Sequence, residues 1–229
     1  MATYLITGAN RGIGLELVRQ AAQSGHHVLA ACRGPGRAGD LSALAAKEAY
    51  DIEVLPMDVA EANSIVAAKA RIGTKPIDVL VNNAGIMGED PQSPLDMDFN
   101  VLTRVLAVNT IAPLRVTKAF LPNIEAAKGK VVVISSVMGS FSYGETSKMA
   151  YCTSKTAVNR LFHGLAQALQ PKGVAVGILS PGWVRTDMGG PQASLSVEQS
   201  ARGLLQQIDA LDLSSSGAFG NYAGRKMAW

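Results

Sequence analysis

The sequence predicts a doubly wound α/β domain, in which a mostly parallel, seven-stranded sheet is covered by helices on both faces. Two observations support this prediction. Short apolar segments alternate with longer amphipathic segments along the chain, and several of the apolar segments lack the polar alternation of half-exposed strands. Strands that are apolar throughout are typical of parallel sheets buried on both sides. Right-handed crossovers between such strands place helices on both faces.

The individual elements follow from this pattern in order. Strands are expected at Thr3–Ile6, His27–Ala31, Ile52–Met57, Ile77–Val81, Lys130–Ser135 and Val174–Leu179, with an edge strand near Ala218–Tyr222. Helices are expected at Ile13–Gln23, Leu41–Ala49, Glu61–Ile72, Val101–Leu121 and Tyr151–Leu169. The last helix repeats apolar residues at three- and four-residue spacing, so one of its faces belongs to the core. The glycine- and proline-rich ranges 34–39, 88–94 and 182–193 are expected to be surface loops.

Length and composition place residues 1–229 in one domain. Hydrophobic residues make up 48% and charged residues 17% of the chain, which suits a sizeable core and argues against disorder. A net charge of +3, without a run of lysine and arginine, gives no indication of nucleic-acid binding. No apolar run approaches the ~18 residues of a membrane span. The N-terminus lacks a signal-peptide pattern, so we expect a cytoplasmic protein.

A glycine-rich turn follows the first expected strand. The segment "TGANRGIG" at Thr7–Gly14 leads from this strand into a helix. Glycines at this place let the backbone approach a pyrophosphate, and the helix N-terminus offers free N–H groups. We therefore expect a dinucleotide site, with Gly8 in the turn, Gly12 at the closest approach and Gly14 at the contact between helix and strand. A tight turn without a ligand is the weaker alternative.

Basic side chains near this turn indicate which dinucleotide to expect. Arg33 follows the second strand, no carboxylate stands at position 32, and Arg11 lies inside the glycine turn. A carboxylate at the end of this strand would bind a ribose 2′-hydroxyl, whereas an arginine accommodates a 2′-phosphate. The sequence therefore predicts NADP(H) rather than NAD(H), unless Arg33 is simply a solvated side chain.

A tyrosine and a lysine are spaced four residues apart in "AYCTSK" at residues 150–155. Tyr151 and Lys155 would lie on one face of a helix, one turn apart. A free tyrosine has a pKa of about 10, and lowering it to about 7 requires about 4 kcal/mol. One positive charge at ~4 Å supplies that much at an effective dielectric constant of about 20. Lys155 is one such charge, and an oxidised nicotinamide, itself cationic, would be another. We therefore expect a phenol that exchanges protons near neutral pH, although an isolated pair of this kind is more often an ordinary helix surface.

These features and four further motifs occur in an order that resembles the short-chain dehydrogenase/reductase family. "NNAG" (Asn82–Gly85) follows the fourth strand, and Asn109 lies in the long helix. "ISS" (Ile134–Ser136) ends the fifth strand, and "PGWVRT" (Pro181–Thr186) follows the sixth. The resemblance covers essentially the whole chain and implies the single-domain Rossmann fold of this family. The length and the C-terminal segment are similar to the sniffer/C-factor subgroup of carbonyl reductases.

The resemblance implies an oxidoreductase that reduces a ketone, aldehyde or quinone to an alcohol, with Tyr151 as the general acid/base. In the family, the serine at Ser136 binds the substrate oxygen, the lysine also holds the nicotinamide ribose, and the asparagine at Asn109 keeps a water near the lysine. Ser136 lies further from Tyr151 than is usual, so Ser135 and Ser142 remain alternatives. The other residues expected at the cofactor are Asn10, Ile13, Asp58, Val59, Asn82, Ala84, Gly85, Pro181, Gly182, Val184 and Thr186.

Partners are also expected from the resemblance. A homodimer or homotetramer would form through the long helices, where the small residues Ala112, Ala157 and Ala166 could allow close packing. The segment Gly189–Leu195 is short where the family carries its lid, which indicates an open pocket. We expect no metal site, because the histidines have no ligand partners at suitable spacing. An NADP-binding sensor or signalling protein with little turnover is the alternative function.

Overall fold

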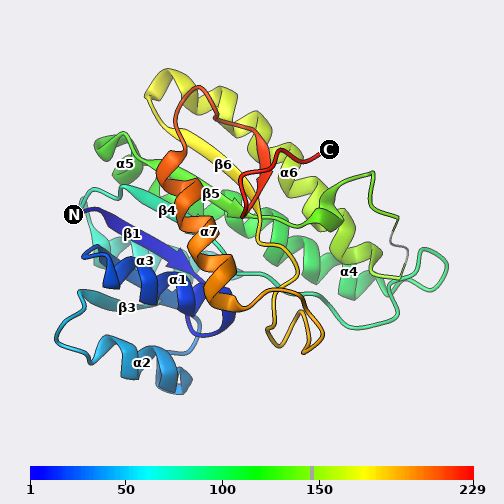
Figure 1. The fold of residues 1–229 in the computed structure, drawn as a ribbon, viewed down its shortest axis with the longest axis horizontal. Helices are drawn as coiled ribbons and strands as arrows, with labels where there is room; N and C mark the ends of the chain where they lie inside the picture. Colours follow the sequence, from blue (N-terminus) through cyan, green and yellow to red (C-terminus); the bar gives the residue numbers. More distant parts are fainter. Residues whose placement is uncertain (145–146) are drawn as a thin grey trace.

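A computed structural model describes residues 1–144 and 147–229 and shows a seven-stranded sheet between two layers of helices (Figure 1). The strand order is β3-β2-β1-β4-β5-β6-β7, and every neighbouring pair is parallel. The strands are β1 (Thr3–Thr7), β2 (His27–Cys32), β3 (Ile52–Pro56), β4 (Val79–Asn82), β5 (Lys130–Ile134), β6 (Ala175–Ser180) and β7 (Phe219–Asn221). The direction of winding reverses between β1 and β4, so the doubly wound Rossmann fold predicted from the sequence is confirmed.

Each face of the sheet has its own hydrophobic core. Leu5 and Ile6 are adjacent in β1 and both fully buried, but they belong to opposite faces because successive strand residues alternate. This double burial explains why the strands are apolar throughout. The Ile6 face is covered by α1 (Gly12–Gln23), α2 (Gly39–Ala45) and α7 (Val197–Ala210). The Leu5 face is covered by α3 (Ala62–Ile72), α5 (Ala112–Ala127) and α6 (Met149–Leu169).

The helix that carries Asn109 differs from the single helix expected over Val101–Leu121. It begins as α4 (Phe99–Leu106), where the Asp98 side chain caps it by accepting a hydrogen bond from the Asn100 N–H. It then widens into the π-helical turn η2 (Ala107–Ile111) and continues directly as α5. A π turn holds one extra residue per turn and is frequent at functional sites. Asn109 lies inside this turn.

Short helical turns and one helix were not expected from the sequence. The turns are η1 (Pro35–Arg37), η3 (Val137–Gly139) and η4 (Gln170–Lys172). The helix is α7, which begins with a capping box in which Ser196 and Gln199 bond each other's backbone N–H groups. The helix expected at Leu41–Ala49 is shorter than expected, because the chain turns back after Ala45 to enter β3.

Two of the small residues expected at a helix-pairing surface lie in the core instead. Ala112 is 0% and Ala166 is 4% exposed, and both pack against the Leu5 face of the sheet. The expectation that they permit packing between subunits is therefore wrong, because they are needed inside the subunit. Only Ala157 of the three is partly exposed.

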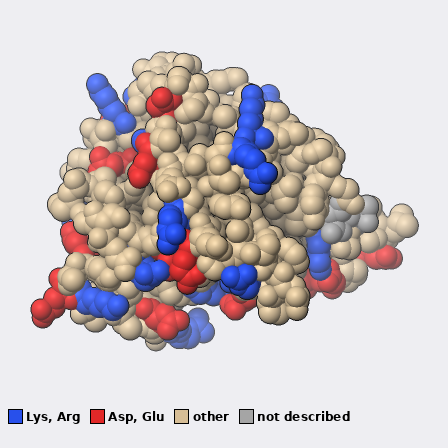
Figure 2. Space-filling view, in the orientation of Figure 1, with Lys and Arg blue, Asp and Glu red and all other residues tan. Residues whose placement is uncertain are grey.

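Lysine, arginine, aspartate and glutamate are interspersed on the face drawn in Figure 2, and no basic region dominates it. In the described parts of the chain, no helix is both long enough and apolar enough to cross a membrane.

Candidate active site

The residues expected at the cofactor and the substrate gather at one edge of the sheet. Because all strands are parallel, their carboxyl ends meet there. The glycine turn follows β1, Arg33 follows β2, and the "NNAG" segment ends β4. Ser136 is the second residue after β5, and Pro181 comes directly after β6. The topology alone therefore brings these separate motifs together.

The glycine turn is tightly packed, and two of its glycines are required by their neighbours. Gly8 has a φ of +66°, and a Cβ atom there would lie 2.9 Å from the Ala84 Cα. A Cβ on Gly14 would lie 2.2 Å from the Gly8 carbonyl oxygen. Gly12 also has a positive φ, of +54°, and faces the Thr186 side chain. Side chains at these positions would push the first strand, the turn and the "NNAG" segment apart.

Two residues outside the expected site hold this turn in place. The Thr7 hydroxyl accepts hydrogen bonds from the N–H groups of Asn83 and Ala84, both at 3.0 Å. The Asn83 side chain donates to the carbonyl oxygens of Thr7 and Gly8 at 2.9 and 3.2 Å. Sequence reasoning assigned no role to either residue, although the position of Thr7 just before the first glycine and of Asn83 inside "NNAG" was a usable signal.

The edge fits an anionic dinucleotide. Helix α1 starts at Gly12 with no side-chain cap and no acidic residue in its first turn, so its N-terminal N–H groups and dipole can receive an anion. Arg11 and Arg33 are exposed next to it. The Asn82 Oδ1 atom, at the end of β4, is buried without a hydrogen-bond partner among the described residues. An uncompensated buried acceptor is costly and points to a missing donor.

The segment after β6 lies over the glycine turn. Arg11 forms an ion pair with Asp187 at 2.6 Å, and a Cβ atom on Gly12 would lie 3.3 Å from the Thr186 Cγ2. The segment is also closed on itself, because the Trp183 indole donates to the Gly189 carbonyl oxygen at 2.8 Å. The glycine turn and this segment therefore form two sides of one site.

The remaining residues expected at the cofactor have different degrees of exposure. Partly buried residues at this edge are Asn10, Ile13, Ala84, Gly85, Pro181, Gly182 and Thr186, whereas Val59 and Val184 are buried. The Asp58 carboxylate accepts a hydrogen bond from the Ala60 N–H at 3.0 Å and so shapes the turn after β3. Gly182 has a φ of +80°, and a Cβ there would collide with Leu195.

Tyr151 and Lys155 are not an exposed helix pair. Their side chains are 7% and 5% exposed, and the Lys155 Nζ lies 5.6 Å from the centroid of the Tyr151 ring. The Lys155 ammonium donates a hydrogen bond to the Ile134 carbonyl oxygen at 2.8 Å, at the end of β5. The two side chains are therefore buried at the carboxyl ends of the strands, next to the end of β5.

Asn109 lies next to Lys155 but its side chain is already engaged. Its Oδ1 accepts from the Ile86 N–H at 2.9 Å, and its Nδ2 donates to the Ile86 carbonyl at 2.8 Å and to the Ser154 hydroxyl at 3.0 Å. A Cβ atom on Gly85 would lie 3.3 Å from the Asn109 Oδ1 and 3.7 Å from the Lys155 Nζ. The π turn, the "NNAG" segment and α6 therefore meet at this point.

Of the three candidate serines, Ser136 is the one in contact with Tyr151. A hydrogen bond with Ser136 acts on the pKa of the Tyr151 phenol. The Ser136 oxygen also accepts from the Met138 N–H at 3.2 Å, which leaves its own proton to be donated elsewhere. Ser135 is instead buried and bonded to Asn159, and Ser142 is bonded to Ser140.

Burial, not the lysine, dominates the acidity of the phenol. Burial raises the pKa of Tyr151, the hydrogen bond with Ser136 offsets this only in part, and the resulting pKa is about 12. Burial also lowers the pKa of Lys155 to about 8. The expectation that Lys155 and an oxidised nicotinamide together bring the phenol close to neutrality stays a prediction, because in the protein alone removing a phenolate from water costs more than Lys155 returns. At pH 7 Tyr151 is protonated and Lys155 is mostly charged.

Comparisons with known proteins identify the family. The sequence model of the family "short chain dehydrogenase" matches residues 2–195. The chain belongs to this family. The C-signal protein of Myxococcus xanthus is 39% identical to this short-chain dehydrogenase over 165 residues, which cover 71% of this chain and 99% of that protein.

Two solved structures of carbonyl reductases are similar over the whole chain. The NADPH-bound carbonyl reductase from chicken fatty liver superimposes with a TM-score of 0.92 at 33% identity, covering 100% of this chain and 99% of that one. The carbonyl reductase Sniffer of D. melanogaster also gives a TM-score of 0.92, at 31% identity and 100% coverage of both chains. The predicted similarity to the sniffer/C-factor subgroup is confirmed.

Proposed function

We propose that this short-chain dehydrogenase is an NADPH-dependent carbonyl reductase that converts a ketone, aldehyde or quinone to an alcohol. The observation that carries the proposal is a buried Tyr151 that contacts Ser136 and lies beside Lys155. A proton donor, a hydrogen-bond donor and a cation thus stand together at the edge of the sheet that fits a dinucleotide. The similarity to an NADPH-bound carbonyl reductase supports the same assignment.

The roles of the side chains follow from their protonation states. NADPH, when bound, would supply the hydride that reduces the carbonyl carbon. Tyr151 would donate its proton to the carbonyl oxygen, and its high pKa keeps that proton in place at neutral pH. Ser136 would hold the same oxygen by a hydrogen bond, which strengthens as negative charge develops there. Lys155 would stabilise the phenolate that remains, and Asn109 would hold the backbone beside Lys155 through both of its bonds to Ile86.

The cofactor choice is proposed from charge. Arg11 and Arg33 would bind the 2′-phosphate of NADP(H), because guanidinium groups match phosphate oxygens in pairs. Arg11 would exchange its exposed ion pair with Asp187 for the phosphate, and such exposed pairs are weak enough to break. The N-terminus of α1 would bind the pyrophosphate, and the unpartnered Asn82 Oδ1 would accept a hydrogen bond from the cofactor.

Replacing Tyr151 by phenylalanine tests the reaction. A panel of small ketones, aldehydes and quinones is mixed with NADPH and followed at the nicotinamide absorbance. For any substrate turned over by the wild type, Tyr151→Phe should lower kcat by about 10²-fold or more, because the proton donor is lost. Tyr50→Phe, which changes a tyrosine between α2 and β3, is the matched control and should keep full activity. Carbonyl reduction at the wild-type rate by Tyr151→Phe would rule out the proposed role.

A second candidate function is an NADP-binding signalling protein with little turnover. The relative named C-signal favours keeping this alternative. Tight binding of NADPH without turnover of any carbonyl in the panel would support it, and turnover of one carbonyl would support the enzyme.

We also propose that the protein forms a homodimer or homotetramer. Sedimentation at micromolar protein concentration tests this proposal, and a monomer at that concentration would contradict it.

A further inference from the structure

We infer that Asn159 is a positioning residue that holds Ser136 against Tyr151. This inference rests on the proposed function, in which Ser136 and Tyr151 act on the same substrate oxygen. Asn159 lies on α6, one turn after Lys155 and two turns after Tyr151, so these side chains share one face of the helix. It is 2% exposed, which is unusual for an asparagine unless both ends of its amide are bonded.

Both ends of the Asn159 amide bond the segment that carries Ser136. The Asn159 Oδ1 accepts a hydrogen bond from the Ser135 hydroxyl. The Asn159 Nδ2 donates to the Gly139 carbonyl oxygen at 3.2 Å. One side chain therefore binds the residue just before Ser136 and the residue three positions after it. Residues 135–139, which connect β5 to the end of η3 and form the bridge that carries Ser136, are therefore attached to α6 at both ends.

The bridge lies so close to α6 that Gly139 has no space for a side chain. A Cβ atom there would lie 2.9 Å from the Asn159 Nδ2 and 2.9 Å from the Lys155 carbonyl carbon. Thr156 also donates to the Gly139 carbonyl oxygen, at 3.0 Å. The backbone at Gly139 therefore packs directly against α6. Its distance from the helix depends on the lack of a side chain at Gly139 and on the length of the Asn159 side chain.

This arrangement makes the placement of Ser136 depend on α6. Tyr151 and Lys155 are on the helix itself, whereas Ser136 is on the bridge, where its side chain bonds Met138 and Tyr151 and its carbonyl oxygen accepts from the Gly139 N–H. Lys155 bonds only the residue just before the bridge, at the Ile134 carbonyl oxygen. Asn159 adds the two attachments that enclose Ser136. Because displacements of about 1 Å in an active site can cost about 10²-fold in rate, loosening these attachments should affect turnover.

Two variants disrupt the contact between α6 and the bridge, one on each partner. Asn159→Ala removes both amide bonds, and Gly139→Ala keeps the amide but forces the bridge away from α6. Each variant should lower kcat by about 10-fold or more while the Kd for NADPH, measured by fluorescence, changes less than about 2-fold. Unchanged kcat in both folded variants would overturn the inference, and so would a matching loss of NADPH affinity.

Asn123→Ala is the matched control. Asn123 is also a buried asparagine that holds a loop, since it donates to the carbonyl oxygens of Gly73 and Lys75 at 2.9 and 2.7 Å. It lies on α5 near the opposite edge of the sheet, where β4 begins. Its loss should reduce stability and leave kcat unchanged. A similar fall in kcat for Asn123→Ala and Asn159→Ala would show only a general effect of destabilisation and would overturn the inference.

A double-mutant cycle with Ser136→Ala separates positioning from other roles. If Asn159 acts through Ser136, adding Asn159→Ala to Ser136→Ala should lower kcat by less than about 2-fold further. Losses that multiply would overturn the inference. If Tyr151→Phe abolishes turnover but Asn159→Ala retains it, the proposed function stands and only the inference fails.

A crystal structure of Asn159→Ala with NADP⁺ decides the question without an activity measurement. We expect the Ser136 hydroxyl to lie beyond hydrogen-bond distance of the Tyr151 hydroxyl in the variant, but within it in a wild-type crystal. A Ser136 that keeps its wild-type contact with Tyr151 would overturn the inference even if the wild type reduced no carbonyl at all.

Discussion

At the scale of the residue, the buried ammonium group of Lys155 lowers the stability of the folded protein. Lys155 is an ammonium group that is 5% exposed, and its one described acceptor is the neutral carbonyl of Ile134. Desolvation of such a cation is compensated only in part by one hydrogen bond, which is why its pKa falls to about 8. Buried charges without a counter-ion are typical of functional sites rather than of stable cores.

Replacing Lys155 by methionine should stabilise the ligand-free protein at pH 7. The folded-state pKa of about 8 lies below the ordinary value of 10.5, so between these pH values the folded protein holds fewer protons than the unfolded chain. The wild type is therefore penalised below pH 8 and regains stability as the pH rises from 8 to 10.5. We expect Lys155→Met to unfold in urea with a free energy about 1–3 kcal/mol higher at pH 7, and with a smaller advantage at pH 10. An advantage that is absent at pH 7, or that grows with pH, would contradict this.

The sequence predicted which side chains meet in the site, but not their protonation. The four-residue spacing places Tyr151 and Lys155 on one helix face, and the structure brings Ser136 to the phenol. The depth of burial depends on the loops that cover the helix, and spacing along α6 contains no information about them. The rise of the Tyr151 pKa in the ligand-free protein could not be predicted from the sequence for this reason.

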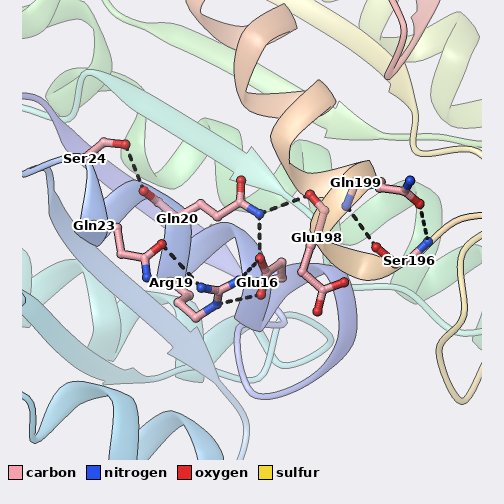
Figure 3. A network of polar contacts seen from close by, with 8 residues as sticks. All are labelled: Glu16, Arg19, Gln20, Gln23, Ser24, Ser196, Glu198 and Gln199. Carbon is pink, nitrogen blue, oxygen red and sulfur yellow. Dashed lines mark hydrogen bonds and ion pairs between the residues drawn. The ribbon is translucent and has the colours of Figure 1, made fainter.

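At the scale of the element, a polar network joins α1 to α7 (Figure 3). These helices follow the glycine turn and the segment after β6, which form the two sides of the cofactor site. Glu16 is a buried carboxylate on α1 that pairs with Arg19 and accepts from the Gln20 side chain. Gln20 also donates to the Glu198 carbonyl oxygen at 3.1 Å, in the first turn of α7. The helix that starts at the glycine turn is thus bonded to the helix that follows the segment after β6.

Removing the cap of α7 should weaken this junction. Ser196→Ala loses the hydrogen bond from the Gln199 N–H and should lower the free energy of unfolding by about 1 kcal/mol, measured by urea denaturation. Ser24→Ala, which removes a serine at the end of α1, is the control and should change stability by less than about 0.5 kcal/mol. Equal effects of the two substitutions would show that the capping box does not stabilise α7.

Two elements that sequence reasoning missed, α7 and the π turn, have different causes. Helix α7 is polar on the whole, and its buried face includes Ser200 and Gly203, so few apolar residues indicate it, although the Ser196–Gln199 capping pattern marked its start. The π turn at Ala107–Ile111 adds one residue to a helix turn, and the 3.6-residue pattern on either side does not reveal it. Strands were easier to predict, since double burial makes them apolar throughout.

At the scale of the whole molecule, the parallel sheet explains why a linear set of motifs becomes one site. The order of the motifs along the chain, together with the topology, was enough to predict that the ends of β1, β2, β4, β5 and β6 carry them. Contacts between loops were not predictable in this way. The Arg11–Asp187 ion pair joins residues that are far apart in sequence, and no local pattern indicates it.

The proposed cofactor should stabilise the whole molecule, and by more the tighter it binds. A ligand at about 100 times its Kd adds about 2.7 kcal/mol to the free energy of unfolding, which for a chain of this size raises Tm by about 5–10 °C. NADPH should therefore raise Tm more than the same concentration of NADH, because only NADPH offers a 2′-phosphate to Arg11 and Arg33. Arg33→Ala should remove most of this difference, measured by differential scanning fluorimetry. Arg71→Ala, which changes an exposed arginine paired with Glu53 at the start of β3, should preserve it, whereas equal shifts with NADH and NADPH in the wild type would contradict the preference for NADP(H).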